Sequence, residues 1–486
     1  MLDAVGPAGI FVGFFVVTAK PIFAGTVALA ACATVAFADK AKRAALREPL
    51  VFTDISQLRE LVRHPHLYLP FAGAGRLIAI GAGGTLVALV LAFVLDPRAV
   101  HWLAVSIGAF AALIVIPGFI GGRCVGPIAQ QLRRLAPSGD LVYDTRRFGP
   151  FATLALYGFI ARDERPGRRA AVRPGTGRRK KSLPRQPPII LVQSESFFDA
   201  GRLPILSPDL LPILQRTRRS SVQWGRLAVP SWGANTARTE FAVLTGISET
   251  ALAFDRFNPY HAFAKAPVDS LAWTLKREGY RTFCIHPFDR TFYRRHRIMP
   301  SLGFDHFFAA ESFRGAERIG SFVSDRAVAR FCAELLEYHR DLPAFLFVIT
   351  MENHGPWPCV SAPRGFVGPA ERLRDLPKGE ELGRYLQTLS HADAMIGLLT
   401  EILARDGRSG LLGFYGDHLP SFPAAFERLQ FSETSTDYLL WRANASPPRL
   451  VDIAAHELSA AILAALRTPM EVGPARWRAH ARASGQ

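Results

Sequence analysis

Two carboxylates, an imidazole and a hydroxyl group are the side chains with the clearest chemical meaning in this chain of 486 residues. Glu195, Asp417 and His418 offer atoms that bind divalent cations, and Thr236 adds a hydroxyl oxygen. Such a cation would favour the alkoxide of Thr236 and allow it to attack phosphorus. Mn²⁺ or Mg²⁺ suits this oxygen-rich set, and Zn²⁺ is compatible with the histidine. The four residues predict one metal site that activates Thr236.

Three further side chains are candidates for binding substrate oxygens or protonating a leaving group: His286, Arg295 and His354. Each also has an ordinary structural alternative. Both histidines precede turn-forming residues, Arg295 belongs to a basic run, and Glu195 and Thr236 could simply cap helices. We predict a site because all of these structural explanations would have to hold at once.

The candidate residues follow predicted strands. Apolar runs predict strands at 189–193, 281–285, 345–350 and 411–415, and helical spacing predicts helices at 270–278, 325–339 and 382–404. Strands separated by helices predict an α/β fold with a mainly parallel sheet covered on both faces. Such sheets bind ligands beyond the carboxyl ends of their strands. Thr236 follows a turn-prone segment, where a helix N-terminus would direct its N–H groups at an anion.

Four motifs carry a resemblance to the lipoteichoic acid synthase and phosphoglycerol transferase family: QSESF from Gln193, NTARTEF from Asn235, MENH from Met351 and YGDH from Tyr415. The resemblance covers about 188–440. Thr236 also stands ten residues before the glycine of a Leu-Thr-Gly run, the place of the nucleophile in the sulfatase signature C-x-P-S-R-x-x-L-L-T-G. A threonine cannot become formylglycine, which argues against sulfate-ester hydrolysis.

The resemblance implies an alkaline-phosphatase/sulfatase-like fold behind a helical membrane anchor. It implies transfer of glycerol phosphate from phosphatidylglycerol to a glycan or lipid acceptor, usually with manganese, outside the cytoplasmic membrane. By motif position, the metal ligands would be Glu195, Thr236, Asp417 and His418, with His286, Arg295 and His354 at the substrate. Tyr293 stands where the family has a tryptophan, which leaves the acceptor open.

The N-terminal third predicts an integral membrane protein. Neither 77–95 nor 102–122 contains a charged residue, and each is close to the ~20 residues that span a bilayer. The segments 21–38 and 4–19 are shorter candidates. Basic residues in 39–76 and after 122 place those segments in the cytoplasm, and the soluble domain with them unless 148–161 crosses the membrane. The resemblance instead places the catalytic domain on the periplasmic side of a bacterial inner membrane.

The formal net charge of +17 is concentrated in one segment. Residues 162–185 contain ten Lys or Arg against two acidic residues, together with Pro and Gly. This composition predicts a disordered linker that can lie on anionic lipid. No nucleic-acid-binding motif accompanies it, so we expect no nucleic-acid partner. The five cysteines lack paired spacing and predict no disulfide framework.

We therefore expect membrane helices at 1–122, a juxtamembrane helix and basic linker at 123–187, a catalytic domain at 188–470 and a tail at 471–486. The predicted activity is metal-dependent phosphoglycerol transfer through a covalent Thr236 intermediate. Alternatives of the same superfamily are a phosphoethanolamine transferase and a phosphodiesterase. The alternative outside enzymes is an inactive membrane sensor or scaffold, which would be expected to have lost one of the ligands.

Overall fold

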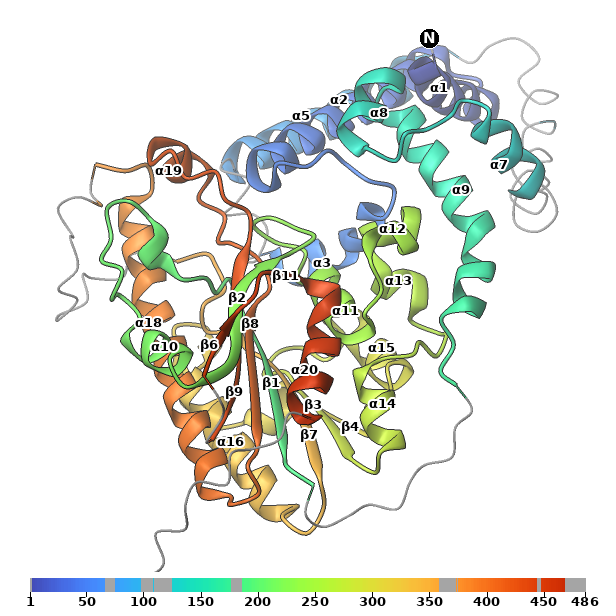
Figure 1. Cartoon of the computed structure of the whole chain (residues 1–486). Helices are drawn as coiled ribbons and strands as arrows, with labels where there is room; N and C mark the ends of the chain where they lie inside the picture. Colours follow the sequence, from blue (N-terminus) through green and yellow to red (C-terminus); the bar gives the residue numbers. More distant parts are fainter. Residues whose placement is uncertain are drawn as a thin grey trace, which may run out of the picture. The chain divides into compact units, whose positions relative to one another are not determined.

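A computed structural model describes residues 2–65, 75–97, 125–175, 186–357, 375–443 and 447–467, together with residues 108 and 373. The chain divides into two compact units (Figure 1). The first contains Met1–Ala171 and Glu249–Ala262, and the second contains Val172–Ser248 and Phe263–Gln486.

The first unit is helical. Its α-helices are α1 (Val5–Thr18), α2 (Pro21–Leu46), α3 (Leu58–Arg63), α5 (Gly75–Leu95), α7 (Val125–Arg133), α8 (Leu141–Phe148), α9 (Pro150–Ala171), α12 (Glu249–Leu252) and most of α13 (Pro259–Phe263). Within the described residues, α2 is the one helix long and apolar enough to cross a membrane, and Leu2–Thr18 and Gly81–Leu95 are shorter apolar helices. The predicted span at 102–122 lies outside the described residues.

Helix α9 extends into the basic segment. The prediction of a disordered linker from residue 162 is wrong for 162–171, which are helical. Arg165 Nη2 lies 2.6 Å from Asp255 Oδ1, and Arg168 Nη2 lies 2.7 Å from Asp255 Oδ2. The Asp255 side chain is fully buried. These two arginines therefore share one buried carboxylate of the same unit as a counter-charge, which a count of local charge cannot reveal. Residues 176–185 lie outside the described residues.

The second unit is built on a nine-stranded sheet. Its strands are β1 (Ile189–Ser194), β2 (Ser221–Ala228), β3 (Arg281–Ile285), β4 (His306–Phe308), β7 (Ala344–Ile349), β8 (Leu411–Gly416), β9 (Thr436–Arg442), β10 (Arg449–Leu450) and β11 (Ile453–Ala454). The order is β10-β2-β9-β8-β1-β7-β3-β4, with β11 also beside β2. Only β9 is antiparallel to its neighbours, so the mainly parallel sheet is confirmed. Strands β5 (Arg318–Ile319) and β6 (Phe322–Val323) form a separate hairpin.

Helices cover both faces of this sheet (Figure 1). On one face lie α10 (Pro212–Arg218), α16 (Asp325–Tyr338) and α18 (Gly379–Arg405), and on the other lie α11 (Thr236–Thr245), α14 (Leu271–Arg277) and α20 (Leu458–Arg467). Two short helices, α15 (Arg295–Ser301) and α19 (Pro423–Arg428), complete the unit. Every residue of β1, β7 and β8 is buried, which is typical of strands covered on both faces.

The strands and helices predicted for the second unit are confirmed to within a few residues at each end, whereas α2 and α9 extend eight and ten residues beyond the apolar segments 21–38 and 148–161. Helix α11 begins at Thr236, as the turn-prone segment before it predicts. Strands β2 and β9 were not predicted from the sequence.

Candidate active site

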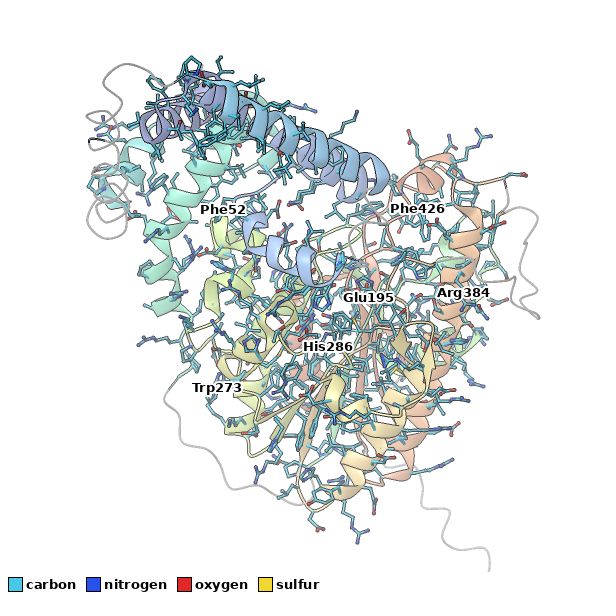
Figure 2. All side chains as sticks on the ribbon, turned by 180° about the vertical axis from the view of Figure 1, so that it is seen from behind. Phe52, Glu195, Trp273, His286, Arg384 and Phe426 are labelled. Atoms are coloured by element: carbon cyan, nitrogen blue, oxygen red, sulfur yellow. The ribbon has the colours of Figure 1, made fainter. Side chains whose placement is uncertain are left out.

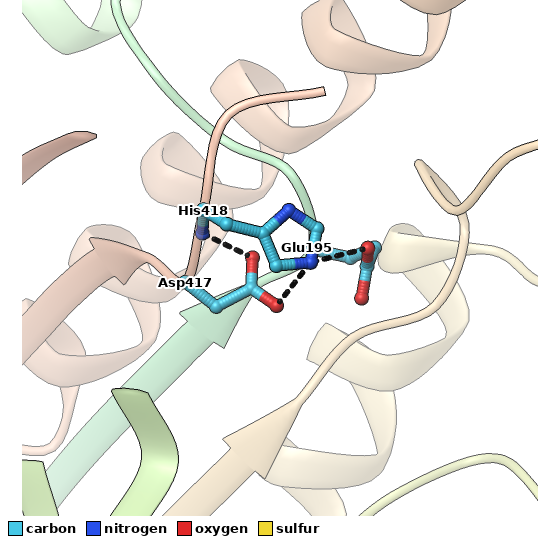
Figure 3. Close-up of side chains that lie close together, drawn as sticks. All are labelled: Glu195, Asp417 and His418. Carbon is cyan, nitrogen blue, oxygen red and sulfur yellow. Dashed lines mark hydrogen bonds and ion pairs between the residues drawn. The ribbon is translucent and has the colours of Figure 1, made fainter. Parts of the chain in front are cut away.

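The two segments that carry Glu195, Asp417 and His418 meet because they follow neighbouring strands. Glu195 follows β1, and Asp417 and His418 follow β8; the two strands are parallel, with Ser194 opposite Gly416. The next residues therefore emerge side by side at the carboxyl edge of the sheet (Figure 3). One ligand atom from each of Glu195, Asp417 and His418 lies within 4.8 Å of the others. This is the one such group among the described residues, and all three side chains are buried.

His418 presents one ring nitrogen to the two carboxylates. Its Nε2 atom lies 3.3 Å from Asp417 Oδ2 and 3.6 Å from Glu195 Oε1. Its Nδ1 atom lies 2.9 Å from the carbonyl oxygen of Leu419. Because a carbonyl only accepts, Nδ1 carries the proton and donates it to this hydrogen bond. Nε2 is therefore the basic nitrogen, the form that a metal ligand requires.

Asp417 has one satisfied and one unsatisfied oxygen. Its Oδ1 accepts hydrogen bonds from the backbone N–H groups of Ser196, at 2.8 Å, and His418, at 2.9 Å. Its Oδ2 is buried and has no hydrogen-bond partner among the described residues. Burial and the nearby Asp417 charge raise the pKa of Glu195 to about 8. A divalent cation would satisfy Oδ2 and neutralise both carboxylates, so these residues fit one.

Thr236 lies against the same nitrogen. Its Oγ1 atom is 3.4 Å from His418 Nε2. Three residues later, Thr239 donates a hydrogen bond from Oγ1 to the Asp417 carbonyl oxygen at 2.7 Å, which holds α11 to the end of β8. The structure therefore brings together all four predicted ligands: Glu195, Thr236, Asp417 and His418.

The turn after β1 requires a glycine on β8. A Cβ atom at Gly416 would lie 1.7 Å from the Phe197 carbonyl oxygen, so only glycine allows this approach. The same turn places Ser196 in the left-handed region, with φ of 52°. Backbone strain of this kind clusters at functional sites, where the surrounding structure fixes it.

His286 and Arg295 meet each other. His286 follows β3, Arg295 begins α15, and Arg295 Nη1 lies 3.0 Å from His286 Nε2. The side chains of His286 and Arg295 are almost fully buried. His286 can be found in Figure 2, near Glu195. Because the guanidinium donates, Nε2 of His286 accepts, and Nδ1 faces the Ile349 carbonyl oxygen at 3.4 Å. Burial and the Arg295 charge hold the pKa of His286 well below its ordinary value, so the ring is neutral.

His354 follows β7 and is partly exposed. Its Nδ1 atom hydrogen-bonds to the carbonyl oxygen of Gly355, which leaves Nε2 as the basic nitrogen. Burial lowers the pKa of His354, while the Asp417 charge opposes the change. The lowered pKa favours the neutral imidazole.

The sequence analysis assigned no role to Asn235 or Glu240, and it named Tyr293 only by its place in the family's motif. Asn235, left-handed at φ 68°, precedes Thr236, and its buried Nδ2 has no hydrogen-bond partner among the described residues. Tyr293, with φ of 51°, places its ring 5.4 Å from Cζ of Arg295. Glu240 lies four residues after Thr236 and forms a buried ion pair with Arg295. The sequence does place Glu240 four residues after Thr236 on a predicted helix, a spacing that puts the two side chains on one face.

The comparisons with known proteins agree with this fold. A relative, "Capsular polysaccharide biosynthesis protein RkpI" of Rhizobium meliloti (strain 1021), is 31% identical over 450 residues, which are 89% of this chain and 79% of that protein. The lipooligosaccharide phosphoethanolamine transferase A (EptA) of Neisseria meningitidis has a similar fold, with a TM-score of 0.53 and 14% identity over 93% of this chain and 86% of its own. The phosphoglycerol transferase GacH of Streptococcus pyogenes, solved with sn-glycerol-1-phosphate, gives a TM-score of 0.49 and 23% identity over 64% of this chain and 80% of its own.

A sequence model of the sulfatase family matches residues 187–468, which contain every candidate site residue. This match covers more than half of the chain, and the similarity to RkpI extends over most of the rest. The chain belongs to the sulfatase family.

Proposed function

We propose that this protein is a membrane-bound, metal-dependent transferase that moves glycerol phosphate from phosphatidylglycerol to a glycan or lipid acceptor. The observation that supports this proposal most strongly is the Thr236 hydroxyl 3.4 Å from His418 Nε2, beside two buried carboxylates. Glu195, Thr236, Asp417 and His418 would hold the cation, which we propose to be Mn²⁺. When bound, such a cation lowers the pKa of a hydroxyl ligand and polarises a phosphoryl oxygen.

In the first half-reaction, Thr236 Oγ1 attacks the phosphorus of the lipid head group. Oγ1 gives up its hydroxyl proton and forms a bond to phosphorus, while the bond to the diacylglycerol oxygen breaks. The leaving oxygen takes up one proton, so the half-reaction releases no net proton. The Asn235 amide and the first N–H groups of α11 are suited to bind the phosphoryl oxygens, because they are donors next to the nucleophile. Thr236 then carries the glycerol phosphate as a phosphodiester.

In the second half-reaction, an acceptor hydroxyl attacks the same phosphorus and frees Thr236. We assign the acceptance of the hydroxyl proton to His354, whose Nε2 is the basic nitrogen of a neutral ring. Both nitrogens of His286 face protein groups, so we assign Arg295 to binding the phosphoryl oxygens and His286 to orienting Arg295 rather than to proton transfer.

The choice of donor rests on the four motifs that resemble phosphoglycerol transferases. The choice of a glycan acceptor is supported by RkpI, which is described as a capsular polysaccharide biosynthesis protein. We propose that α2 anchors the chain in a bacterial inner membrane and that the catalytic domain acts on its periplasmic face.

The test is diacylglycerol release by the purified protein in liposomes of phosphatidylglycerol with Mn²⁺. We expect release that stops with a chelator and in Thr236→Ala. Release from phosphatidylethanolamine alone would instead identify a phosphoethanolamine transferase. Failure to cleave either lipid would contradict the proposed activity and favour an inactive sensor or scaffold.

A further inference from the structure

A chain of buried polar side chains runs beside the metal site. The Tyr415 hydroxyl donates to Gln193 Oε1 at 2.7 Å, and Gln193 Nε2 donates to Glu240 Oε2 at 3.0 Å. Glu240 then accepts from Arg295 twice, from Nε at 3.2 Å and from Nη2 at 2.7 Å. Arg295 Nη1 continues the chain to His286 Nε2 at 3.0 Å. All five side chains are buried.

Three residues of this hydrogen-bonded series lie two or four positions from a predicted ligand in the sequence. Gln193 precedes Glu195 by two residues, and Tyr415 precedes Asp417 by two residues. Glu240 lies one helical turn after Thr236, so the two side chains share a face of α11. The hydrogen-bond chain therefore joins the two ligand-bearing strands and the nucleophile helix to the Arg295–His286 pair.

Glu240 determines how Arg295 is oriented. A carboxylate that accepts from Nε and Nη2 grips one edge of the planar guanidinium and fixes its plane. The other side of the plane, at Nη1, is thereby directed to His286. Since Nη1 donates, His286 must accept at Nε2 and carry its proton on Nδ1. One carboxylate on the nucleophile helix thus fixes both the arginine and the tautomer of the histidine.

We propose that Glu240 is a positioning residue of the phosphoryl site, which acts through Arg295 and His286 and touches no substrate itself. The inference rests on the proposed function to the extent that Arg295, which His286 helps to orient, binds phosphoryl oxygens. If Glu240 were only a buried ion-pair partner, its removal would lower the stability of the fold without a specific effect on anion binding.

The test is a double-mutant cycle on the Mn²⁺-loaded full chain in detergent, with calorimetric binding of inorganic phosphate as the readout. We expect Arg295→Met to weaken phosphate binding by about a hundredfold. We expect Glu240→Gln to weaken it by roughly tenfold, within the range of coupled neighbours. The double variant should bind phosphate no more weakly than Arg295→Met alone. Losses that multiply in the double variant, or normal binding by Glu240→Gln or by Arg295→Met, would overturn the proposal.

A second readout reports on His286 directly and needs no phosphate. ¹⁵N NMR of labelled histidine should show the Nδ1–H tautomer for His286 in the native protein and a mixture of tautomers in Glu240→Gln. An unchanged tautomer would overturn the role of Glu240. The matched control is Glu337→Gln, which removes the carboxylate of an exposed pair with Arg340 and should change neither readout.

Two features keep the test decisive. If Glu240→Gln does not fold, the cycle is run with Glu240→Asp, which keeps the counter-charge of Arg295 but shortens the reach of the carboxylate. Neither readout uses a lipid, so a protein that fails to cleave phosphatidylglycerol but shows the predicted coupling would refute the donor and retain Glu240. If native protein and Glu240→Gln cleaved phosphatidylglycerol equally, the donor would be retained and the role of Glu240 refuted.

Discussion

The Oγ1 atom of Thr236 lies 3.4 Å from Nε2 of His418, although 182 positions separate the two residues in the chain. Thr236 begins α11 and His418 follows β8, and the Thr239 hydrogen bond to the Asp417 carbonyl oxygen holds these two elements together. The proposed nucleophile is therefore placed by a helix start that is tied to the segment carrying two predicted metal ligands.

Replacing Asp417 by asparagine should affect metal binding and metal-free stability in opposite directions. The asparagine side chain would keep an oxygen for the N–H groups of Ser196 and His418, but the change removes a buried negative charge whose Oδ2 atom has no hydrogen-bond partner among the described residues. We expect Mn²⁺ affinity to fall at least about a hundredfold and the Tm of the metal-free protein to rise. Thermal unfolding with Mn²⁺ and with a chelator measures both effects. The control is the exposed Asp209→Asn, and an Asp417→Asn variant that binds Mn²⁺ normally would exclude Asp417 as a ligand.

Metal binding should depend on pH through Glu195. Burial, and then Asp417, raise the pKa of this carboxyl from 4.5 to about 8, so the metal-free folded protein holds a proton there at neutral pH. A cation must displace that proton. Below pH 8, Mn²⁺ affinity should therefore fall by about tenfold per pH unit, with one proton released on binding. Calorimetry at pH 7 in two buffers of different ionisation enthalpy counts the proton, and an affinity that is constant from pH 6 to 8 would contradict the prediction.

The raised pKa of Glu195 should also make the stability of the metal-free protein depend on pH, but in the opposite direction to its metal affinity. A carboxyl whose pKa is raised on folding contributes stability that is present below pH 4.5 and lost as the pH rises through 8. Chelated protein should lose stability over this range, whereas protein saturated with Mn²⁺ should not. Denaturant unfolding at pH 5 and pH 8 measures the difference.

Gly416→Ala should disrupt the proposed metal site by displacing the turn after β1. The added Cβ would meet the Phe197 carbonyl oxygen, so the turn that carries Glu195 must move away from Asp417. We expect a loss of about 3 kcal/mol in the free energy of unfolding and weaker Mn²⁺ binding. Gly383→Ala in α18 is the control, because its added Cβ atom would come no closer than 3.8 Å to another residue and because alanine favours a helix. Equal stability of the two variants would contradict the account of this turn.

The first unit offers an independent test of the buried ion pairs. Asp255→Asn leaves Arg165 and Arg168 without their buried counter-charge and should destabilise this unit by about 3–5 kcal/mol. Limited trypsin digestion should then cut α9 at these arginines more rapidly. In Asp163→Asn, which removes a more exposed partner of Arg133, cleavage should stay close to that of the native protein.

The proposed metal ligands could be predicted to lie together from the sequence because they follow apolar runs that are buried in a parallel sheet. Glu195 and Asp417 could be placed at one edge of the sheet from the order of strands and helices alone. Thr236 could be placed at a helix start because turn-forming residues precede it. Apolar runs and turn-forming residues are local features of the sequence, so they can be recognised in one sequence.

The features that escaped prediction depend on residues far apart in the chain. The pairing of Glu240 with Arg295 joins positions 55 apart, and the neutralisation of Arg165 by Asp255 joins positions 90 apart. Strand β9 runs antiparallel between β8 and β2, and nothing in its apolar run sets that direction. Such contacts are set by packing between elements, which residue spacing does not encode.

The most direct test of the central claim is mass spectrometry of the protein after incubation with phosphatidylglycerol and Mn²⁺ without an acceptor. The account predicts one glycerol phosphate attached to Thr236, present in Thr236→Ser at the serine and absent from Thr236→Ala. Diacylglycerol release without an adduct, or with an adduct on another residue, would contradict Thr236 as the nucleophile.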